Sequence, residues 1–192
     1  PALSEYYTAL GQHTALYQTY QQIHDASIFN TLPVAQQSAI KLALRDFKLS
    51  GVALEGDAKK RYAEISARLS QLSSDFSNHV LDATQAYFKP LTEDQLAGLP
   101  QSSVELLTQY GQQRELEQAV ATLDIPSYLA IMTYASDRTV REELYKAYTT
   151  RASEQSDLPE FDNTPVMEEI LGLRQEMAQI LGFQNYAELS LA

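Results

Sequence analysis

The feature that most constrains the fold is a run of apolar side chains between residues 62 and 83, spaced at alternate steps of three and four. An α-helix has about 3.6 residues per turn, so this spacing places all of the side chains on one face and predicts a helix of about six turns. The members of this stripe are Tyr62, Ile65, Leu69, Leu72, Phe76, His79 and Ala83. A seven-residue period would also suit a coiled coil, but the repeat covers only about three heptads and lacks systematic flanking charge pairs. We therefore expect packing against the helix formed by the first residues.

The first 50 residues show the same spacing and predict two helices. One long helix is expected over residues 3–24, with its face formed by Leu3, Tyr6, Leu10, His13, Tyr17, Tyr20 and His24. The stretch 30–33 interrupts it, and Pro33 suits the first turn of a second helix. Gly51 would close that second helix in a left-handed conformation, and the two helices should form a hairpin.

The pattern changes in the middle of the chain, where short elements are expected. Residues 87–90 predict an edge strand ending in Pro90, because proline cannot donate to a ladder. Residues 119–123 are small and branched and predict a second strand that pairs with the first. Thr92 with Gln95, and Ser102 with Glu105, match the capping box, so each pair should begin a short helix.

From Pro126 onward the chain should be helical again. One helix is expected over 128–134 and another along the face from Val140 to Arg151, separated at 136–137. The polar residues 154–163 predict a surface loop. Thr164 would be the N-cap of the last long helix, which Gly182 and Phe183 should end in a Schellman motif, and a further helix should begin at Asn185.

These elements together predict a mainly α fold of antiparallel helical hairpins or a bundle, with at most a minor two-stranded β element. We expect residues 1–192 to form a single helical fragment. Its parts would be a helical hairpin or bundle over 1–84, a mixed connector over 85–125 and a helical part over 126–192. The chain begins without methionine and inside an amphipathic pattern, so its two ends are expected to be cut points in a longer polypeptide.

Charge and composition exclude several classes of partner. With 25 acidic and 14 basic residues the formal charge is −11, which disfavours nucleic acid and anionic lipid. The sequence has no cysteine, so disulfides and thiolate metal sites are excluded. No apolar run approaches the roughly 20 residues that cross a bilayer, and the first residues lack a signal-peptide pattern. A cytoplasmic protein without membrane or nucleic-acid partners is expected.

A search for reactive groups finds no complete catalytic site. His13 and His24 are about 16 Å apart along a helix axis, and none of the three histidines, His79 included, belongs to an H-E-x-x-H pattern. We expect all three to pack between helices with a ring nitrogen satisfied. Adjacent acids, such as those at 142–143, 168–169 and 55 with 57, point to different sides and should be solvated. No residue is therefore expected to be catalytic, cofactor-binding or metal-ligating.

Tyrosine is the aromatic residue that the sequence uses most, with twelve copies. Four of them, Tyr128, Tyr134, Tyr145 and Tyr148, fall in the helical region after residue 126. Two interpretations are open: they line a polar cleft that binds peptide through aromatic faces and hydroxyls, or they pack between amphipathic helices.

Three stretches together resemble a known family. They are EISARLSQLSSDFSNHVLDAT at 64–84, LDIPSYL with YKAYTTRAS within 123–153, and MEEILGLR with LGFQNYAELSLA within 167–192. They are similar to the thimet oligopeptidase family of zinc metallopeptidases along nearly the whole chain. The resemblance implies a large, mainly helical, two-lobed parent enzyme whose deep channel admits short peptides and excludes folded proteins. This chain would belong to the N-terminal lobe.

The resemblance also implies a zinc site outside this chain. In the family, zinc is held by H-E-F-G-H on one helix and a glutamate from the next, and the glutamate of the motif activates the metal-bound water. None of these residues has a counterpart here. The resemblance therefore implies that the polypeptide continues past Ala192 and before Pro1, that zinc binds downstream, and that this part is inactive alone. Its partners would be the remainder of the polypeptide and short peptide substrates.

One alternative from another class is open. The amphipathic stripes would also suit a free-standing helical interaction module that binds a partner helix in a groove. An isolated lobe should expose a large apolar patch where its missing partner docks, whereas a self-contained module should be closed except for one groove.

Overall fold

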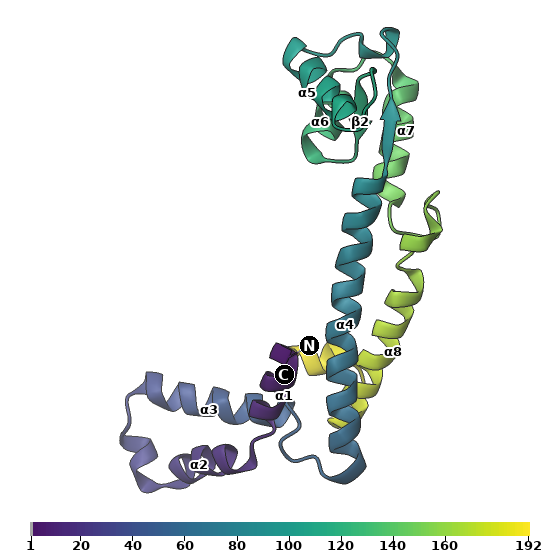
Figure 1. Ribbon diagram of the computed structural model, residues 1–192. Helices are drawn as coiled ribbons and strands as arrows, with labels where there is room; N and C mark the ends of the chain where they lie inside the picture. The colour runs from purple at the N-terminus through teal and green to yellow at the C-terminus, as the bar shows by residue number, and fades with distance from the viewer. Residues whose placement is uncertain (1) are drawn as a thin grey trace. The chain divides into compact units, whose positions relative to one another are not determined.

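The computed structural model describes residues 2–192 and is mainly helical, as expected, with a single two-stranded sheet among these residues (Figure 1). Its longest helix is α4, Gly56–Ala86, which confirms the helix that the apolar spacing predicts. Ile65, Leu72 and Ala83 of that stripe are buried. None of the helices in the described part of the chain combines the length and the apolarity that a membrane crossing needs.

The chain divides into two compact units. The first consists of Pro1–Ser74 together with Glu168–Ala192, and the second is Asp75–Met167. Helices α4 and α8 each continue from one unit into the other, so the first unit combines both ends of the chain and the second is the continuous segment between them.

The first unit begins with two helices where the sequence predicts one, so the prediction of a single helix over residues 3–24 is wrong. Helix α1 is Ala2–Gly11 and α2 is Thr14–Asp25. His13 between them adopts an extended conformation (φ −79°, ψ 94°), and its Nδ1 accepts a hydrogen bond from the Leu16 amide at 3.1 Å. The histidine therefore starts a new helix instead of continuing the old one.

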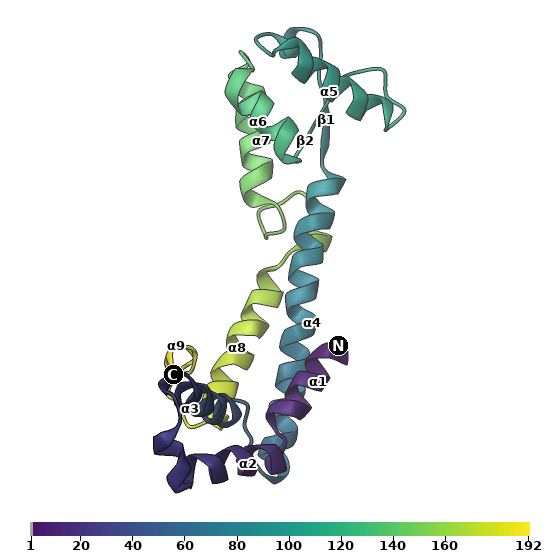
Figure 2. The ribbon, with the colours of Figure 1, turned by 90° about the vertical axis from the view of Figure 1, so that its left-hand side faces the viewer.

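The predicted hairpin is formed by α2 and α3, Val34–Leu49, which are joined by the 3-10 helix η1, Ser27–Thr31 (Figure 2). The rings of Tyr17 and Tyr20 lie 5.9 and 5.8 Å from the buried ring of Phe47, measured between centroids. Pro33 directly precedes α3 and occupies its N-cap.

Helix α3 ends as the sequence predicts. Gly51 has φ +75°, the left-handed region that costs glycine nothing. The amide of Gly51 donates to the carbonyl of Lys48 at 3.0 Å and that of Val52 to the carbonyl of Phe47 at 3.1 Å. These two bonds form a Schellman motif.

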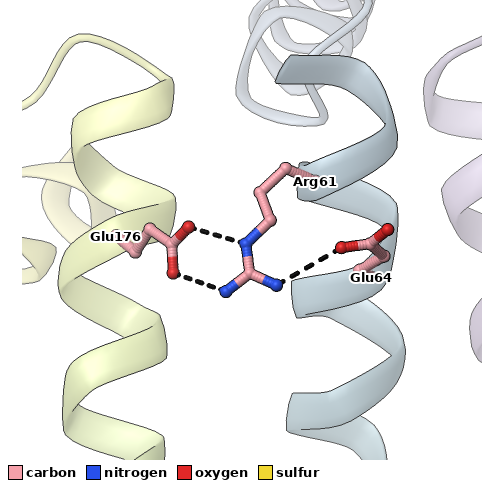
Figure 3. Close-up of polar contacts among 3 residues, drawn as sticks. All are labelled: Arg61, Glu64 and Glu176. Carbon is pink, nitrogen blue, oxygen red and sulfur yellow. Dashed lines mark hydrogen bonds and ion pairs between the residues drawn. The ribbon is translucent and has the colours of Figure 1, made fainter. Parts of the chain in front are cut away.

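Within the first unit, two ion pairs connect α4 with α8, Thr164–Ile180. Nε and Nη2 of Arg61 donate to the two carboxylate oxygens of Glu176, each at 2.7 Å, and Nη1 of Arg61 also reaches Glu64 at 3.3 Å (Figure 3). Arg68 makes the same two-pronged contact with Glu169, at 2.6 and 2.7 Å. The arginines are seven residues apart on α4 and the glutamates seven apart on α8. We call these two contacts the α4–α8 ladder.

Helix α8 ends in the predicted Schellman motif. Gly182 has φ +86°, and the amides of Gly182 and Phe183 donate to the carbonyls of Gln179 and Ala178 at 3.0 and 2.9 Å. The last helix, α9, is Tyr186–Leu191, and the Asn185 side chain caps it by accepting the Glu188 amide at 3.0 Å.

The second unit contains the predicted sheet. Strand β1, Phe88–Pro90, pairs antiparallel with β2, Val120–Thr122, and Phe88 lies opposite Thr122. The 3-10 helix η2 is Asp94–Leu96, and the Thr92 amide donates to the Gln95 side chain at 3.0 Å, one of the two bonds expected of that capping box. The predicted box at Ser102 is wrong, because α5, Gln101–Gln112, already begins before Ser102 with Pro100 as its N-cap.

Helices α6, Ile125–Tyr134, and α7, Arg138–Thr150, complete the core of the second unit, with the predicted break between them. Asp137 caps α7 by accepting the Thr139 amide at 2.8 Å. Helix α7 is followed by the 3-10 helix η3, Pro159–Phe161. The buried core consists of Leu91, Leu107, Ala119, Ala121, Leu123, Ile131, Ala135, Val140 and Leu144.

Candidate functional site

The second unit contains a pocket of about 300 Å³ bounded by the end of α4, one face of α7 and the loop 155–158. Its α7 side includes Glu143, Lys146, Ala147, Thr150 and Arg151. These positions follow the i, i+3, i+4, i+7, i+8 spacing of one helical face, which explains how one helix and its C-cap residue Arg151 supply one side of the pocket. We call this cavity the α7 pocket.

One part of the α7 pocket is acidic and contains Tyr87, Glu143 and Asp157. Burial raises the pKa of the Tyr87 phenol, and the nearby carboxylates of Glu143 and Asp157 raise it further. Both carboxylates therefore act on the same hydroxyl group. Lys89 of β1 forms an ion pair with Glu143, so one of the two negative charges is compensated.

Another part of the pocket is basic. The Arg151 guanidinium lies over the ring of Tyr148, 3.9 Å from its centroid, and its Nη1 donates to the Tyr148 carbonyl. Nε of Arg151 is buried and has no hydrogen-bond partner among the described residues. Lys146 and Arg151 take part in none of the ion pairs found between side chains of residues 2–192.

Burial raises the pKa of the Tyr128 phenol, and two of the other tyrosines singled out by sequence, Tyr145 and Tyr148, raise it further. Tyr128 and Tyr148 stack with ring centroids 4.1 Å apart and pack against the buried core, which is the packing interpretation. Tyr134 and Tyr145 are about half exposed, at 51% and 55%. Tyr145 lines a separate depression of about 300 Å³ that also includes Arg138 and Arg141.

The three histidines have different surroundings, and the expectation that all pack between helices is wrong for His13, which is exposed and caps α2. His24 is half-buried, with its ring centroid 4.7 Å from that of Phe29 and Nδ1 3.0 Å from Asp25. Nδ1 of His79 lies 2.9 Å from Oδ1 of Asn163, which satisfies that ring nitrogen as expected.

Sequence reasoning missed Asn163, which it placed in a surface loop. Its side chain is only 1% exposed, and its Nδ2 donates to the Phe76 carbonyl at 3.1 Å. The backbone carbonyl of Asn163 accepts a hydrogen bond from the backbone amide of Met167 at 2.9 Å, the first helical hydrogen bond of α8. Asn163 therefore directly precedes α8, one residue before the predicted N-cap Thr164. Its side chain bonds His79 and the Phe76 carbonyl and not an amide of α8, so its burial had no local signal in the sequence.

The adjacent acids act separately, as their spacing predicts. Glu143 pairs with Lys89 and Glu169 with Arg68, while Glu142 and Glu168 are exposed. In residues 2–192, no three side chains of the metal-binding types gather closely enough to hold an ion.

Comparisons with known proteins show which protein family this chain resembles. Residues 1–59 match the family model described as Neurolysin/Thimet oligopeptidase, N-terminal domain, and residues 131–192 match the model for Peptidase family M3. The oligopeptidases A of Salmonella typhimurium and Escherichia coli are each 50% identical to the chain over 194 residues, which cover all of it. This chain belongs to peptidase family M3. A probable cytosolic oligopeptidase A of Arabidopsis thaliana is 38% identical over 200 residues.

The M3 relatives are much longer than this chain. The chain spans 28% of the length of each of the three proteins just named. The alignments to these relatives cover the whole chain, which confirms the similarity to the thimet oligopeptidase family that the sequence motifs indicate.

Proposed function

We propose that this chain is a structural, channel-forming part of the N-terminal lobe of a zinc-dependent oligopeptidase that hydrolyses short peptides, and that it is not catalytic by itself. The observation that carries the proposal is 50% identity along the entire chain to proteins named oligopeptidase A, of which it spans only 28%. Identity at this level over every element supports a shared fold and a shared role in the parent enzyme.

The described residues suit a wall better than a reaction centre. Paired helices held by the α4–α8 ladder supply rigid surfaces that position a peptide and exclude bulky substrates. The residues present do not fit zinc, since no set of three ligand-type side chains converges within 2–192. No hydrolytic step is therefore assigned to them, and the proposal places zinc and its ligands downstream in the same polypeptide.

The partners in this proposal are the catalytic lobe of the same polypeptide and short peptide substrates. A cytoplasmic location belongs to the proposal as well, supported by the relative in Arabidopsis thaliana, a probable cytosolic oligopeptidase A.

The test compares the 192-residue chain with the full-length protein expressed from its gene. With a short internally quenched peptide as substrate, the full-length protein should be active and the chain inactive at equal concentration. A chelator should abolish the activity and added zinc should restore it, while casein, a long protein substrate, should remain uncut. Substitution of the glutamate in an H-E-x-x-H motif by glutamine should give an inactive full-length control.

The sequence of the gene beyond the codon for Ala192 provides a second test of the proposal. A stop codon directly after Ala192, or peptide hydrolysis by the chain alone, would overturn the proposal. A stop codon would make the free-standing helical interaction module the function to examine.

A further inference from the structure

The α7 pocket brings charges of both signs around an apolar floor, and no established role accounts for it. We propose that this pocket binds a short zwitterionic peptide of the dipeptide class, with its ammonium group at Glu143 and Asp157 and its carboxylate at Arg151. This inference goes beyond the proposed function, because it concerns a binding site that neither requires nor performs hydrolysis.

The acidic end has one uncompensated negative charge. Tyr87, Glu143 and Asp157 line the pocket together, and the two carboxylates add to the effect of burial in raising the pKa of the Tyr87 phenol. Lys89 compensates Glu143, whereas Asp157 takes part in none of the ion pairs found among residues 2–192. An ammonium group of a ligand would neutralise this remaining charge and donate hydrogen bonds to the carboxylates.

The opposite end has positive charge without a carboxylate partner. Stacking on Tyr148 fixes the Arg151 guanidinium, and Nη1 is used by the Tyr148 carbonyl. Nε is buried and has no partner in the described chain, so a carboxylate would be recognised by Nη2 and by the positive charge of the guanidinium. Lys146 lies between the two ends on the same face of α7 and adds a second cation for the carboxylate.

The spacing of Glu143 and Arg151 along the chain is comparable to the length of a short ligand. Glu143 lies in α7 and Arg151 is its C-cap residue, so their backbone positions are about 12 Å apart along the helix axis. An extended dipeptide spans about 7 Å, and a hydrogen bond of about 2.8 Å at each end brings the total to about 12–13 Å.

The floor of the pocket selects the side chain. The apolar residues that line the pocket are Ala83, Leu123, Ala147 and Leu158. A cavity of about 300 Å³ is at the lower limit of known small-molecule sites, which fits a dipeptide with one aliphatic side chain. L-Alanyl-L-leucine meets these requirements and serves as the probe.

The experiment is isothermal titration calorimetry of the full-length protein with this dipeptide at neutral pH, in the presence of a chelator so that turnover does not consume the ligand. Two analogues each remove one charge: N-acetyl-L-alanyl-L-leucine lacks the ammonium and L-alanyl-L-leucinamide lacks the carboxylate. We expect each analogue to bind about tenfold or more weakly than the dipeptide, because each loses one charge-assisted contact.

Substitutions locate the site. Asp157→Asn and Arg151→Gln should each weaken binding of the dipeptide about tenfold. Asp157→Asn should bind the N-acetyl analogue as the unsubstituted protein does, because the contact to Asp157 is already absent. Matched controls are Glu160→Gln, an exposed acid in η3 directly after the pocket loop, and Arg174→Gln, whose guanidinium also lies over a tyrosine ring, that of Tyr186, outside the pocket. Both controls should bind like the unsubstituted protein.

Several results would overturn the inference: equal affinity for the dipeptide and both analogues, dipeptide affinity unchanged in both pocket variants, or no binding at millimolar concentration. The analogues test the unsubstituted protein, so they decide the matter even where Arg151→Gln lowers the thermal midpoint. Binding is read without turnover, so absence of peptide hydrolysis would count against the proposed function and leave this inference standing.

Discussion

At the residue scale, Asn163 connects α4 with the segment after α7 and with the start of α8. Its side chain forms hydrogen bonds with His79 and with the backbone carbonyl of Phe76, both in α4. Its backbone N–H donates to the backbone carbonyl of Ala152 at 3.1 Å. A polar side chain with 1% exposure is stable only because each of its polar groups has a partner. Because Oδ1 of Asn163 can only accept a hydrogen bond, Nδ1 of His79 must carry the proton in this contact.

We predict that Asn163→Ala lowers the free energy of unfolding by about 2–3 kcal/mol, because it removes two hydrogen bonds and leaves buried partners unsatisfied. Chemical denaturation monitored by circular dichroism measures the change. The control is Asn78→Ala, an exposed position on α4 where the effect should stay within about 0.5 kcal/mol. Equal effects at the two positions would show that the Asn163 contacts contribute nothing.

Two helical glycines should respond in opposite directions to alanine. A Cβ at Gly111 would overlap the carbonyl oxygen of Gln118, whereas a Cβ at Gly172 meets nothing within 4 Å. We predict that Gly111→Ala destabilises by about 1–3 kcal/mol through overpacking, and that Gly172→Ala stabilises by about 0.5–1 kcal/mol through helix propensity. Thermal denaturation of the two variants tests the difference in sign, and the same sign at both sites would contradict it.

At the element scale, the α4–α8 ladder fixes the antiparallel register of two helices within the first unit. Both rungs use a guanidinium that faces both oxygens of a carboxylate, the most directional ion pair available to side chains. A shift of one helix by one residue would break both rungs, because the seven-residue spacing is the same on each helix. Exposed pairs contribute little stability individually, so their main effect is on register.

We predict that the ladder contributes stability at neutral pH and loses it in acid. Hydrogen bonds from Arg61 and Arg68 hold the pKa of Glu176 and Glu169 below the ordinary value of 4.5. A lowered folded-state pKa gives stability that is present above the unfolded pKa and is lost as the pH falls through the folded pKa. The thermal midpoint of Arg61→Gln/Arg68→Gln should therefore be below that of the unsubstituted chain at pH 7, and the difference should shrink below about pH 4.

The control for this pH dependence is Arg45→Gln. Arg45 pairs with its neighbour Asp46 on α3 and connects no two helices. Its substitution should shift the midpoint less at pH 7. A ladder difference that persists unchanged at pH 3, or that does not shrink at high salt, would contradict an electrostatic origin.

At the scale of the whole molecule, helix α1 has an apolar stripe that faces solvent. Leu3, Tyr6, Tyr7 and Leu10 follow the i, i+3, i+4, i+7 spacing and are 67%, 60%, 60% and 38% exposed. Exposed stripes of this kind mark surfaces that are covered in the complete assembly. Under the proposed function, the rest of the polypeptide would cover this one.

We predict that the 192-residue chain self-associates and binds a hydrophobic dye at concentrations where the full-length protein does neither. Leu3→Gln/Tyr7→Gln in the chain should reduce both signals. Val34→Gln is the matched control, since Val34 is 78% exposed and lies outside the α1 stripe. Sedimentation velocity and dye fluorescence measure the two properties. A monomeric chain that binds no dye would show that this stripe is tolerated in water.

The sequence by itself determined the identity of most elements, because their signals are local. The three-four spacing of α4, the positive φ of Gly51 and Gly182, and the pairing of residues 88–90 with 120–122 all follow from rules that act within a few residues or between two adjacent strands. The family also followed from sequence, because 50% identity extends over every element.

Only the tertiary structure decided where the chain departs from those local rules. The apolar stripe continues through residue 13, yet the chain breaks there because His13 caps a second helix that packs against α3. Asn163 reads as a polar loop residue but is buried, since its partners are 84 and 87 residues away in sequence. The α7 pocket likewise depends on Tyr87 and Asp157 meeting one face of α7. Contacts between residues far apart in the chain produce no periodic pattern in the sequence. They could therefore be seen only in the tertiary structure.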